Sequence, residues 1–280
     1  MIYKEFKEQP VTAFYKILAG SFLYIMAVSL FISALVFVLG KLGLEQILDA
    51  AGLKKLKELM EMQGSNTDLK SKSEAMNGFI KQYPSFSIFI PCTIFLLVVT
   101  MAYLFNVSQL FIKKQLMRET TSWWKMLTPG RDYIKISIYL FLITGIVFSA
   151  MAFTVITAMN YPLMGLIAGF IFTIMIVRNI LFIPGVVLGN MSFIDSLRYS
   201  LETISSGRAF KIQIFGFLIF LILGFIISGL LYFPSEINKA LWFQIFLNLF
   251  AFYIQIGCVS VGIASLFIRY GNFQEEKMAD

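Results

Sequence analysis

The amino-acid sequence predicts an all-α membrane protein, a bundle of six transmembrane helices with amphipathic helices at the membrane surface. Of its 280 residues, 58% are hydrophobic and only 14% are charged, and the mean hydropathy is +0.79. A soluble domain has about 25% charged residues, so this chain has too little polar surface to cover an aqueous fold. It also contains six apolar runs, each long enough to supply the roughly 20 residues that cross a bilayer.

The six predicted spans form a single transmembrane domain. They cover residues 14–39, 86–112, 133–159, 161–184, 210–233 and 241–268. The third and fourth runs nearly merge, but Asn160 and Pro162 supply a turn and a helix breaker between them. We therefore expect these two spans to form a tight hairpin, and we expect the fourth span to end at Pro184 and Gly185.

Basic residues predict the orientation of the spans. They gather before the first span, after the second and after the fourth, whereas the turn between spans three and four has none and the turn between spans five and six has only Lys239. Lys and Arg are enriched in cytoplasmic loops, so both termini are predicted to be cytoplasmic in a bacterial inner membrane. The net charge of +7 then indicates anionic lipid head groups as partners, not nucleic acid.

The segment 41–85 is an exception to this rule. It carries seven lysines beside six acidic residues, yet the number of spans before it places it outside the cell. Apolar residues near helical spacing from Leu44 to Met60 predict an amphipathic helix on the outer membrane face. The polar stretch from Gly64 to Ser73 is expected to be mobile.

Short motifs recur at the ends of the spans. Spans one, three and five open with similar triplets, and spans two, four and six close with Leu-Phe-Ile. The triplets are Tyr15-Lys16-Ile17, Ile134-Lys135-Ile136, Phe210-Lys211-Ile212, Leu110-Phe111-Ile112, Leu181-Phe182-Ile183 and Leu266-Phe267-Ile268. They fit either three repeated helical hairpins around a central axis or the high frequency of Leu, Phe and Ile in this chain.

Residues typical of catalysis and metal binding are scarce. The chain has no histidine, its carboxylates lie in loops and termini, and Cys92 and Cys258 lie inside apolar runs. The sequence therefore predicts no catalytic residue, no cofactor and no metal site. The first apolar run begins after mixed acids and bases, which indicates a retained span and not a cleaved signal peptide.

Two places in the chain are candidate functional sites. Arg178 is the only basic residue well inside a span, and with its neighbour Asn179 it fits either a lipid or internal polar contact or a working site in the membrane. Residues 192–208 predict an amphipathic helix on the cytoplasmic surface, ending at Gly207. Its apolar stripe could rest on lipid or form a partner-docking surface, and it consists of Phe193, Leu197, Leu201 and Ile204.

The stretch from Ile174 to Ile212 carries a resemblance. It contains Arg178 before an apolar run ending at Pro184, then Ser196-Leu197-Arg198-Tyr199-Ser200, then Gly207-Arg208-Ala209-Phe210. It resembles the membrane domain attached to some glycerophosphodiester phosphodiesterases, and related stand-alone six-span bacterial proteins of unknown function. Those families have Ala where this chain has Ser196. The resemblance implies a six-span protein associated with the envelope or its lipids; no segment here resembles the phosphodiesterase domain itself.

These observations lead to one functional prediction and two alternatives. The prediction is a non-enzymatic integral membrane protein that assists envelope or lipid-related processes through contacts with membrane lipids or a membrane protein partner. The first alternative is a transporter or the permease subunit of a nucleotide-driven pump, with residues 192–208 pressed against an ATPase subunit. The second is an intramembrane lipid-modifying enzyme that uses Arg178 or Asn179.

Overall fold

The computed structural model describes residues 10–63, 69–117, 127–130, 132–160, 162–205, 207–212 and 241–270, together with positions 214, 226 and 229. Within these residues the chain is helical and has no strand, which agrees with the all-α prediction. The helices are α2 (Pro10–Ile47), α3 (Ala50–Gln63), α4 (Leu69–Gln82), α5 (Phe86–Met117), α7 (Tyr133–Asn160), α8 (Pro162–Arg178), α9 (Phe182–Val187), α10 (Phe193–Thr203) and α12 (Leu241–Tyr270).

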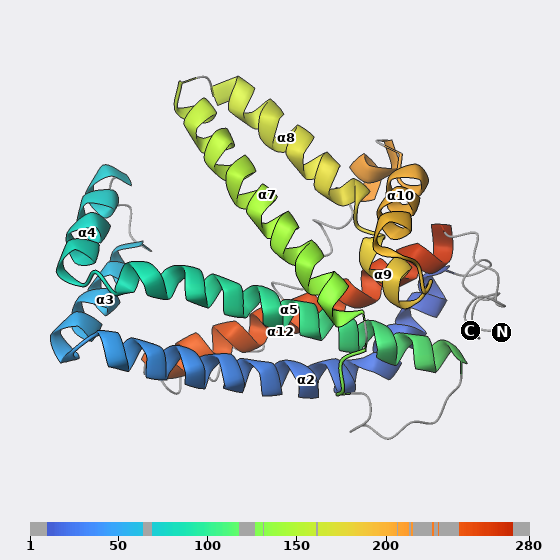
Figure 1. The fold of residues 1–280 in the computed structure, drawn as a ribbon, viewed down its shortest axis with the longest axis horizontal. Helices are drawn as coiled ribbons and strands as arrows, with labels where there is room; N and C mark the ends of the chain where they lie inside the picture. The colour runs from blue at the N-terminus through green and yellow to red at the C-terminus, as the bar shows by residue number, and fades with distance from the viewer. Residues whose placement is uncertain are drawn as a thin grey trace.

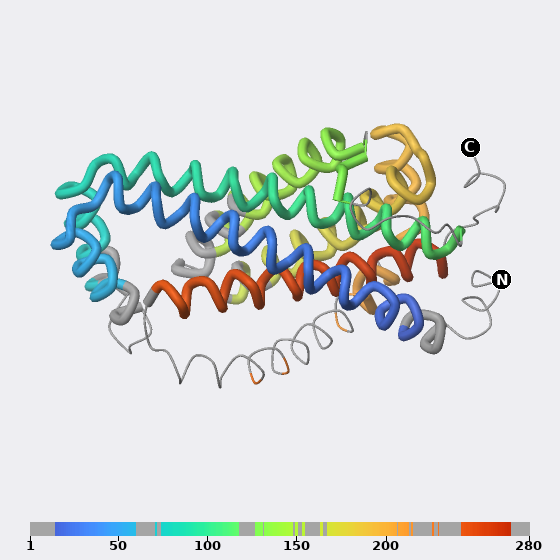
Figure 2. Tube along the Cα trace, turned by 90° about the horizontal axis from the view of Figure 1, so that it is seen from below, coloured from blue at the N-terminus to red at the C-terminus, as the bar shows by residue number. Residues whose placement is uncertain are grey.

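Helices α2, α5 and α12 lie side by side and form one layer (Figure 1, Figure 2). The buried face of α2 arises from apolar residues repeated every four positions. These are Tyr24, Val28, Ile32 and Val36. The ring of Tyr24 stacks on that of Phe111 in α5, with centroids 4.3 Å apart. On the other side, a Cβ on Gly257 of α12 would lie 2.3 Å from Cγ2 of Ile25, so only glycine allows this approach of α12 to α2.

Helices α7 and α8 form an antiparallel hairpin that branches away from this layer (Figure 1). The turn lies between Asn160, the last residue of α7, and Pro162, the first of α8. Proline suits the first helical position because its φ is already helical and the N–H it lacks would have no partner there. The tight hairpin expected between the third and fourth apolar runs is therefore present.

Residues 41–85 form more helix than the sequence suggested. Helix α2 runs on to Ile47, well beyond the predicted end at residue 39, and the expected amphipathic helix is α3. Residues 69–73, expected to be mobile, form the start of α4, while 64–68 lie outside the described residues. The apolar side chains of α3 contact protein: Leu53, Leu56 and Leu59 pack on the cluster of Leu48, Phe79 and Phe86.

Four helical stretches among the described residues are long and apolar enough to cross a membrane. They are Tyr15–Ile47, Phe86–Met117, Ile167–Val187 and Trp242–Arg269, and Tyr133–Val147 is a shorter apolar stretch. The fifth predicted span, 210–233, falls largely outside the described residues, and Lys239 lies outside them as well. The six-span count therefore stays a prediction.

The two ends of the layer carry different surface helices. Helices α3 and α4 lie at one end, whereas α9, α10, the start of α2 and the end of α12 lie at the other (Figure 1). We call them the α3–α4 end and the α9–α10 end. The segments predicted to be cytoplasmic thus share one end within the described part of the chain. Which side of a membrane that end faces stays a prediction.

The triplets that close the even-numbered spans meet at the α9–α10 end. One buried cluster contains Ile112, Leu181, Phe267 and Ile268, and a neighbouring cluster contains Phe182 and Ile183. Three distant parts of the sequence therefore contribute to one level of the core. Three repeated hairpins would require the fifth span as well, so the repeat also stays a prediction.

Candidate functional site

The fourth apolar run is interrupted before the proline that was expected to end it. Helix α8 ends at Arg178, three residues form turns, and α9 then continues from Phe182 through Pro184 to Val187. Proline has no N–H and its ring clashes with the carbonyl four residues earlier, which here is Ile180. The break therefore falls one turn before Pro184, and the predicted end at Pro184 and Gly185 is wrong.

Two serines of α10 bind the backbone at this break. The Ser200 hydroxyl accepts a hydrogen bond from the Leu181 N–H at 3.0 Å and donates one to the Arg178 carbonyl at 2.8 Å. The Ser196 hydroxyl donates to the Phe182 carbonyl at 2.6 Å. Both serines are fully buried. They replace part of the helical ladder that the break removes, which a buried backbone requires.

Sequence reasoning missed these serines, although a signal was present. At 100° per residue, Ser196 and Ser200 fall on the same side of the helix as Phe193 and Leu197. Serine on the apolar side of an amphipathic helix indicates a buried hydroxyl that needs a partner. A proline nearby indicates a disturbed helix, and the backbone at such a break supplies partners, here the Arg178 and Phe182 carbonyls.

Gly185 lets α9 approach α10 closely. A Cβ at this position would lie 2.3 Å from the Ser196 hydroxyl oxygen, far inside van der Waals contact. Gly185, Ser196 and Ser200 thus have one structural role: together they hold α10 against the interrupted helix.

Arg178 makes an internal polar contact. Its Nε donates to the Ile204 carbonyl and its Nη2 to the Leu201 carbonyl, both at 3.1 Å. These carbonyls belong to the C-terminal end of α10, where the helix dipole places partial negative charge and four carbonyls lack helical partners. Arg178 therefore links the C-terminal end of α8 to the C-terminal end of α10.

Asn179 is also bonded to nearby backbone and side chains. Its Nδ2 donates to the Met175 carbonyl at 3.0 Å, and the backbone carbonyl of Asn179 accepts a hydrogen bond from the Tyr139 hydroxyl at 2.9 Å. Tyr139 belongs to α7, and its ring stacks on Phe182 with centroids 3.9 Å apart. The break is thereby tied to α7 as well as to α10.

The predicted docking stripe faces mostly inward. Phe193 and Leu197 pack on the buried cluster that contains Phe182, and Ile204 is fully buried beside Leu181. Only Leu201 of the four is exposed, and it shares the outward side of α10 with Ile194, which is 75% exposed. A partner of α10 would therefore contact Ile194 and Leu201.

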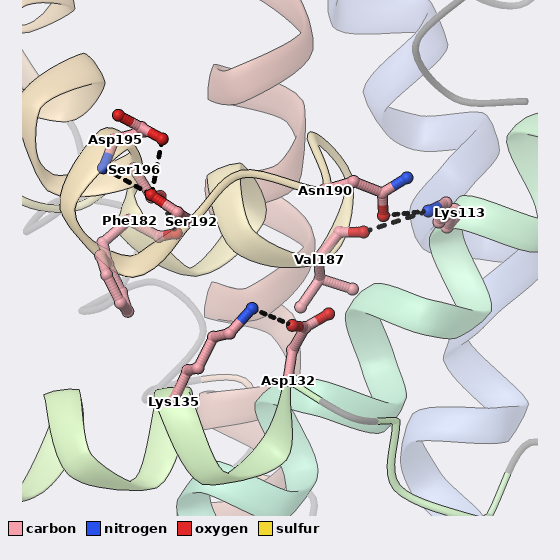
Figure 3. A network of polar contacts seen from close by, with 9 residues as sticks. All are labelled: Lys113, Asp132, Lys135, Phe182, Val187, Asn190, Ser192, Asp195 and Ser196. Atoms are coloured by element: carbon pink, nitrogen blue, oxygen red, sulfur yellow. Dashed lines mark hydrogen bonds and ion pairs between the residues drawn. The ribbon is translucent and has the colours of Figure 1, made fainter. Parts of the chain in front are cut away.

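Helix α10 begins as predicted and ends early. Ser192 is the N-cap: its hydroxyl accepts from the Asp195 N–H at 3.2 Å and donates to the Asp195 carboxylate at 2.6 Å (Figure 3). The helix stops at Thr203 instead of the expected Gly207, because Ile204 turns to an extended conformation with ψ 90° and enters the core.

A lysine binds the C-terminal end of α9, as Arg178 binds the C-terminal end of α10. Lys113 of α5 donates to the Asn190 side-chain oxygen at 2.9 Å and to the Val187 carbonyl at 3.4 Å (Figure 3). Asn190 adopts φ 50°, a left-handed conformation that asparagine tolerates and that ends helices. Both α9 and α10 therefore have a basic side chain from another helix at their C-terminal ends.

The polar residues of the second span make contacts between elements, as expected for buried amides. Gln109 donates to the Ser260 carbonyl of α12 at 2.7 Å, and Asn106 accepts from the Gly130 N–H at 2.8 Å. Both amide side chains are fully buried. They join α5 to α12 and to the segment that precedes α7.

An apolar hollow of about 600 Å³ lies along α7 and is bordered by Phe172 of α8. Seven of the eight residues that line it are apolar or glycine, with Ser149 as the exception. They are Phe141, Leu142, Gly145, Ile146, Ser149, Ala150, Phe153 and Phe172. Its chemistry suits hydrocarbon or an apolar side chain.

Within the described residues, no group of three His, Cys, Asp or Glu side chains lies close enough to hold a metal ion. Comparison of the chain with protein-family models, with curated proteins and with solved structures finds no match. The class of protein therefore rests on the fold: an all-helical chain with four helical stretches that fit an integral membrane protein.

Proposed function

We propose that this protein is a multi-span integral membrane protein of the bacterial inner membrane that works through contacts with lipid or with another membrane protein, in support of envelope or lipid-related processes. The observation that carries this proposal is the apolar surface of the α7–α8 hairpin. Among the side chains of α7 and α8 that the structure describes, twelve large hydrophobic ones are exposed, six from each helix. Surface of this size and kind is stable only against lipid or another apolar partner.

The arrangement of polar groups supports the same proposal. The conspicuous polar side chains at the α8–α9 break, Arg178, Ser196 and Ser200, bind backbone groups of the same chain. A residue used in this way stabilises the fold. The resemblance to the membrane domain found with some phosphodiesterases adds support for an association with envelope lipids, and the placement of basic residues supports cytoplasmic termini.

The proposal is tested by extracting the full-length protein from its own membrane in polymer nanodiscs and analysing it by native mass spectrometry. We expect a retained lipid class or a stoichiometric protein partner. Repeated turnover of a lipid by the pure protein would overturn the proposal, and so would recovery of a lone protein with no preferred lipid or partner.

A pair of glycine variants tests whether lipid or a protein partner binds at the hollow beside α7. Gly145 lines the hollow, and a Cβ at this position would have no other atom within 4 Å, so the side chain introduced by Gly145→Leu starts in open space and occupies part of the hollow. Gly40 of α2 also has open space and is the matched control. We expect Gly145→Leu to reduce co-purification of the lipid or partner and Gly40→Leu to leave it unchanged. Equal effects would exclude the hollow as the contact site.

A second candidate is the permease subunit of a nucleotide-driven pump. The observation in its favour is the outward side of α10, where Ile194 and Leu201 are exposed on a helix firmly bonded to a spanning helix. Such a helix would transmit force from an ATPase partner. Ile194→Asp should then abolish co-purification of the ATPase, and an unchanged complex would argue against docking at α10.

A further inference from the structure

Buried polar side chains are concentrated in the layer of α2, α5 and α12. Among the described residues, ten serine, threonine and amide side chains are buried, and eight of them belong to these three helices. Thr100 shares a hydrogen bond with Tyr253 of α12 at 2.6 Å, and Ser21 of α2 donates to Gln115 at 3.2 Å. Thr100 and Gln115 lie about 22 Å apart along α5, at 1.5 Å per residue. Polar groups therefore follow this interface over much of its length.

Two serines lie at the same level of the α2–α5 interface. The two helices run in opposite directions (Figure 2), and Ser21 meets Gln115. Ser29 comes eight residues after Ser21, and Ser108 comes seven residues before Gln115, so each serine lies about 11 Å from that contact. Ser29 is 0% and Ser108 1% exposed, and within the described chain neither hydroxyl oxygen has a hydrogen-bond partner.

Both serines point toward the junction of the three helices. In α2, Ser29 follows one turn after Ile25, which is the residue that meets α12. In α5, Ser108 lies on the side between Gln115, which bonds α2, and Gln109, which bonds α12. The two hydroxyls are therefore enclosed by α2, α5 and α12.

Two amides of α5 form a second pair of this kind. Asn106 and Gln109 are three residues apart, which makes their side chains neighbours, with Cβ atoms about 5–6 Å apart. Both amides are fully buried, and each is bonded through one atom only. In the part of the chain that the structure describes, the Asn106 Nδ2 and the Gln109 Oε1 have no partner. One group is a donor and the other an acceptor, so a single water molecule satisfies both.

We propose that the interior of the α2–α5–α12 layer binds water molecules at these two pairs, between the serine hydroxyls and between the amides. A buried polar group without a partner costs free energy, and a buried water makes about three hydrogen bonds to such groups. Water suits the two pairs better than an ion, because hydroxyls and neutral amides do not compensate the charge of a buried ion. The inference does not depend on the contact proposed for the α7–α8 hairpin.

The first test is X-ray radiolytic labelling of the full-length protein in nanodiscs, read by mass spectrometry. X-rays generate hydroxyl radicals from water where it is bound, and a thiol beside that water is oxidised. Ser108→Cys places a thiol of similar size at the site, in a Cys92→Ser background. Val107→Cys is the matched control, since Val107 is fully buried in an apolar cluster of the same interface. We expect oxidation several times faster at position 108 than at position 107 or at the buried Cys258. Equal rates at 107 and 108 would overturn the inference.

A second test needs no introduced thiol. If water binds the Ser108 hydroxyl, Ser108→Ala should raise the unfolding equilibrium constant about fivefold, the value of one hydrogen bond, measured as the rate at which maleimide labels Cys258. Ser33→Ala is the control and should change little, because the Ser33 hydroxyl bonds the Ser29 carbonyl within its own helix. A Ser108→Ala protein as stable as the parent, or more stable, would show a dry site and overturn the inference. Either failure leaves the lipid or partner contact of α7 and α8 as it was, since co-purification measures that contact separately.

Discussion

The α3–α4 end and the α9–α10 end of the layer each include two short helices, but the two pairs of helices differ in the buried interactions that attach them. Apolar packing around Leu48, Phe79 and Phe86 holds α3 and α4 together, and the Tyr83–Asp49 hydrogen bond at that end is exposed. At the other end, hydroxyls of Ser196 and Ser200 bond to backbone groups of the interrupted helix. Apolar packing is non-directional and tolerates small shifts, whereas a buried hydrogen bond depends on particular atoms. We therefore expect the α9–α10 end to be far more sensitive to substitution.

The largest effect is expected for Ser200→Ala. This change leaves the Leu181 N–H and the Arg178 carbonyl without their partner in a buried site, and each unsatisfied group costs about 1–3 kcal/mol. We expect a loss of about 3 kcal/mol in the free energy of unfolding. The measurement is the rate at which maleimide labels the buried Cys258 as temperature rises, in a Cys92→Ser background.

Ser265→Ala is the matched control for this prediction. The Ser265 hydroxyl donates to the Val261 carbonyl within its own helix, at 2.8 Å, so removing it leaves the helical ladder of α12 intact. A small effect is expected. If both variants lost the same stability, the special role of the α8–α9 break would be disproved.

The next effect concerns the glycine contact. In Gly185→Ala the added Cβ displaces the Ser196 hydroxyl, which lies 2.3 Å from its position, at a cost of about 2 kcal/mol. The double variant with Ser196→Ala should lose less than the sum of the two single changes, because one atom of the clash is gone. Thermal labelling of Cys258 measures all three.

Gly52, at the α3–α4 end, is the glycine to compare with Gly185. A Cβ on Gly52 would lie 2.8 Å from Cζ of Tyr83, but this partly exposed ring can move aside. Gly52→Ala should therefore destabilise the protein less than Gly185→Ala. The reverse order would show that the α3–α4 end is the more tightly specified of the two.

A smaller and local effect is expected for Arg178→Met. Two carbonyls at the end of α10 lose their cationic donor, which at a partly exposed helix end amounts to about 1 kcal/mol. Hydrogen–deuterium exchange should become faster in residues 193–204 and stay unchanged in α3 and α4. Loss of bound lipid with unchanged exchange would instead favour a lipid-anchoring role for Arg178.

The smallest effect is expected for Tyr83→Phe. The Tyr83 hydroxyl donates to the Asp49 carboxylate at 3.1 Å, and burial together with this bond raises the pKa of Tyr83 above its ordinary value of 10.0. Because the folded-state pKa is raised, the contribution is present below pH 10 and is lost as the pH rises through the folded value. An ultraviolet difference titration against Tyr83→Phe should show one tyrosine that ionises late; an ordinary titration would contradict the contact.

Much of the fold was predictable because long apolar helices can be recognised from the composition of the sequence. The helix class, the hairpin at Asn160 and Pro162 and the amphipathic helix that begins near residue 192 followed from local patterns. Sequence reasoning failed where the partners lie on other elements: α10 ends early because Ile204 enters the core beside Leu181, and Phe193 and Leu197 face inward because they pack on the cluster around Phe182. The break before Pro184 has a local cause, the clash of the proline ring with the Ile180 carbonyl one turn earlier, which sequence reasoning did not apply.

The sequence by itself thus determined which segments are helical and apolar, since both properties depend on residues a few positions apart. Only the tertiary structure decided what Arg178, Ser196 and Ser200 do. Their roles depend on which backbone groups lie opposite them when α8, α9 and α10 pack together. A hydrogen bond requires two atoms within about 3 Å, and a linear pattern does not contain that distance.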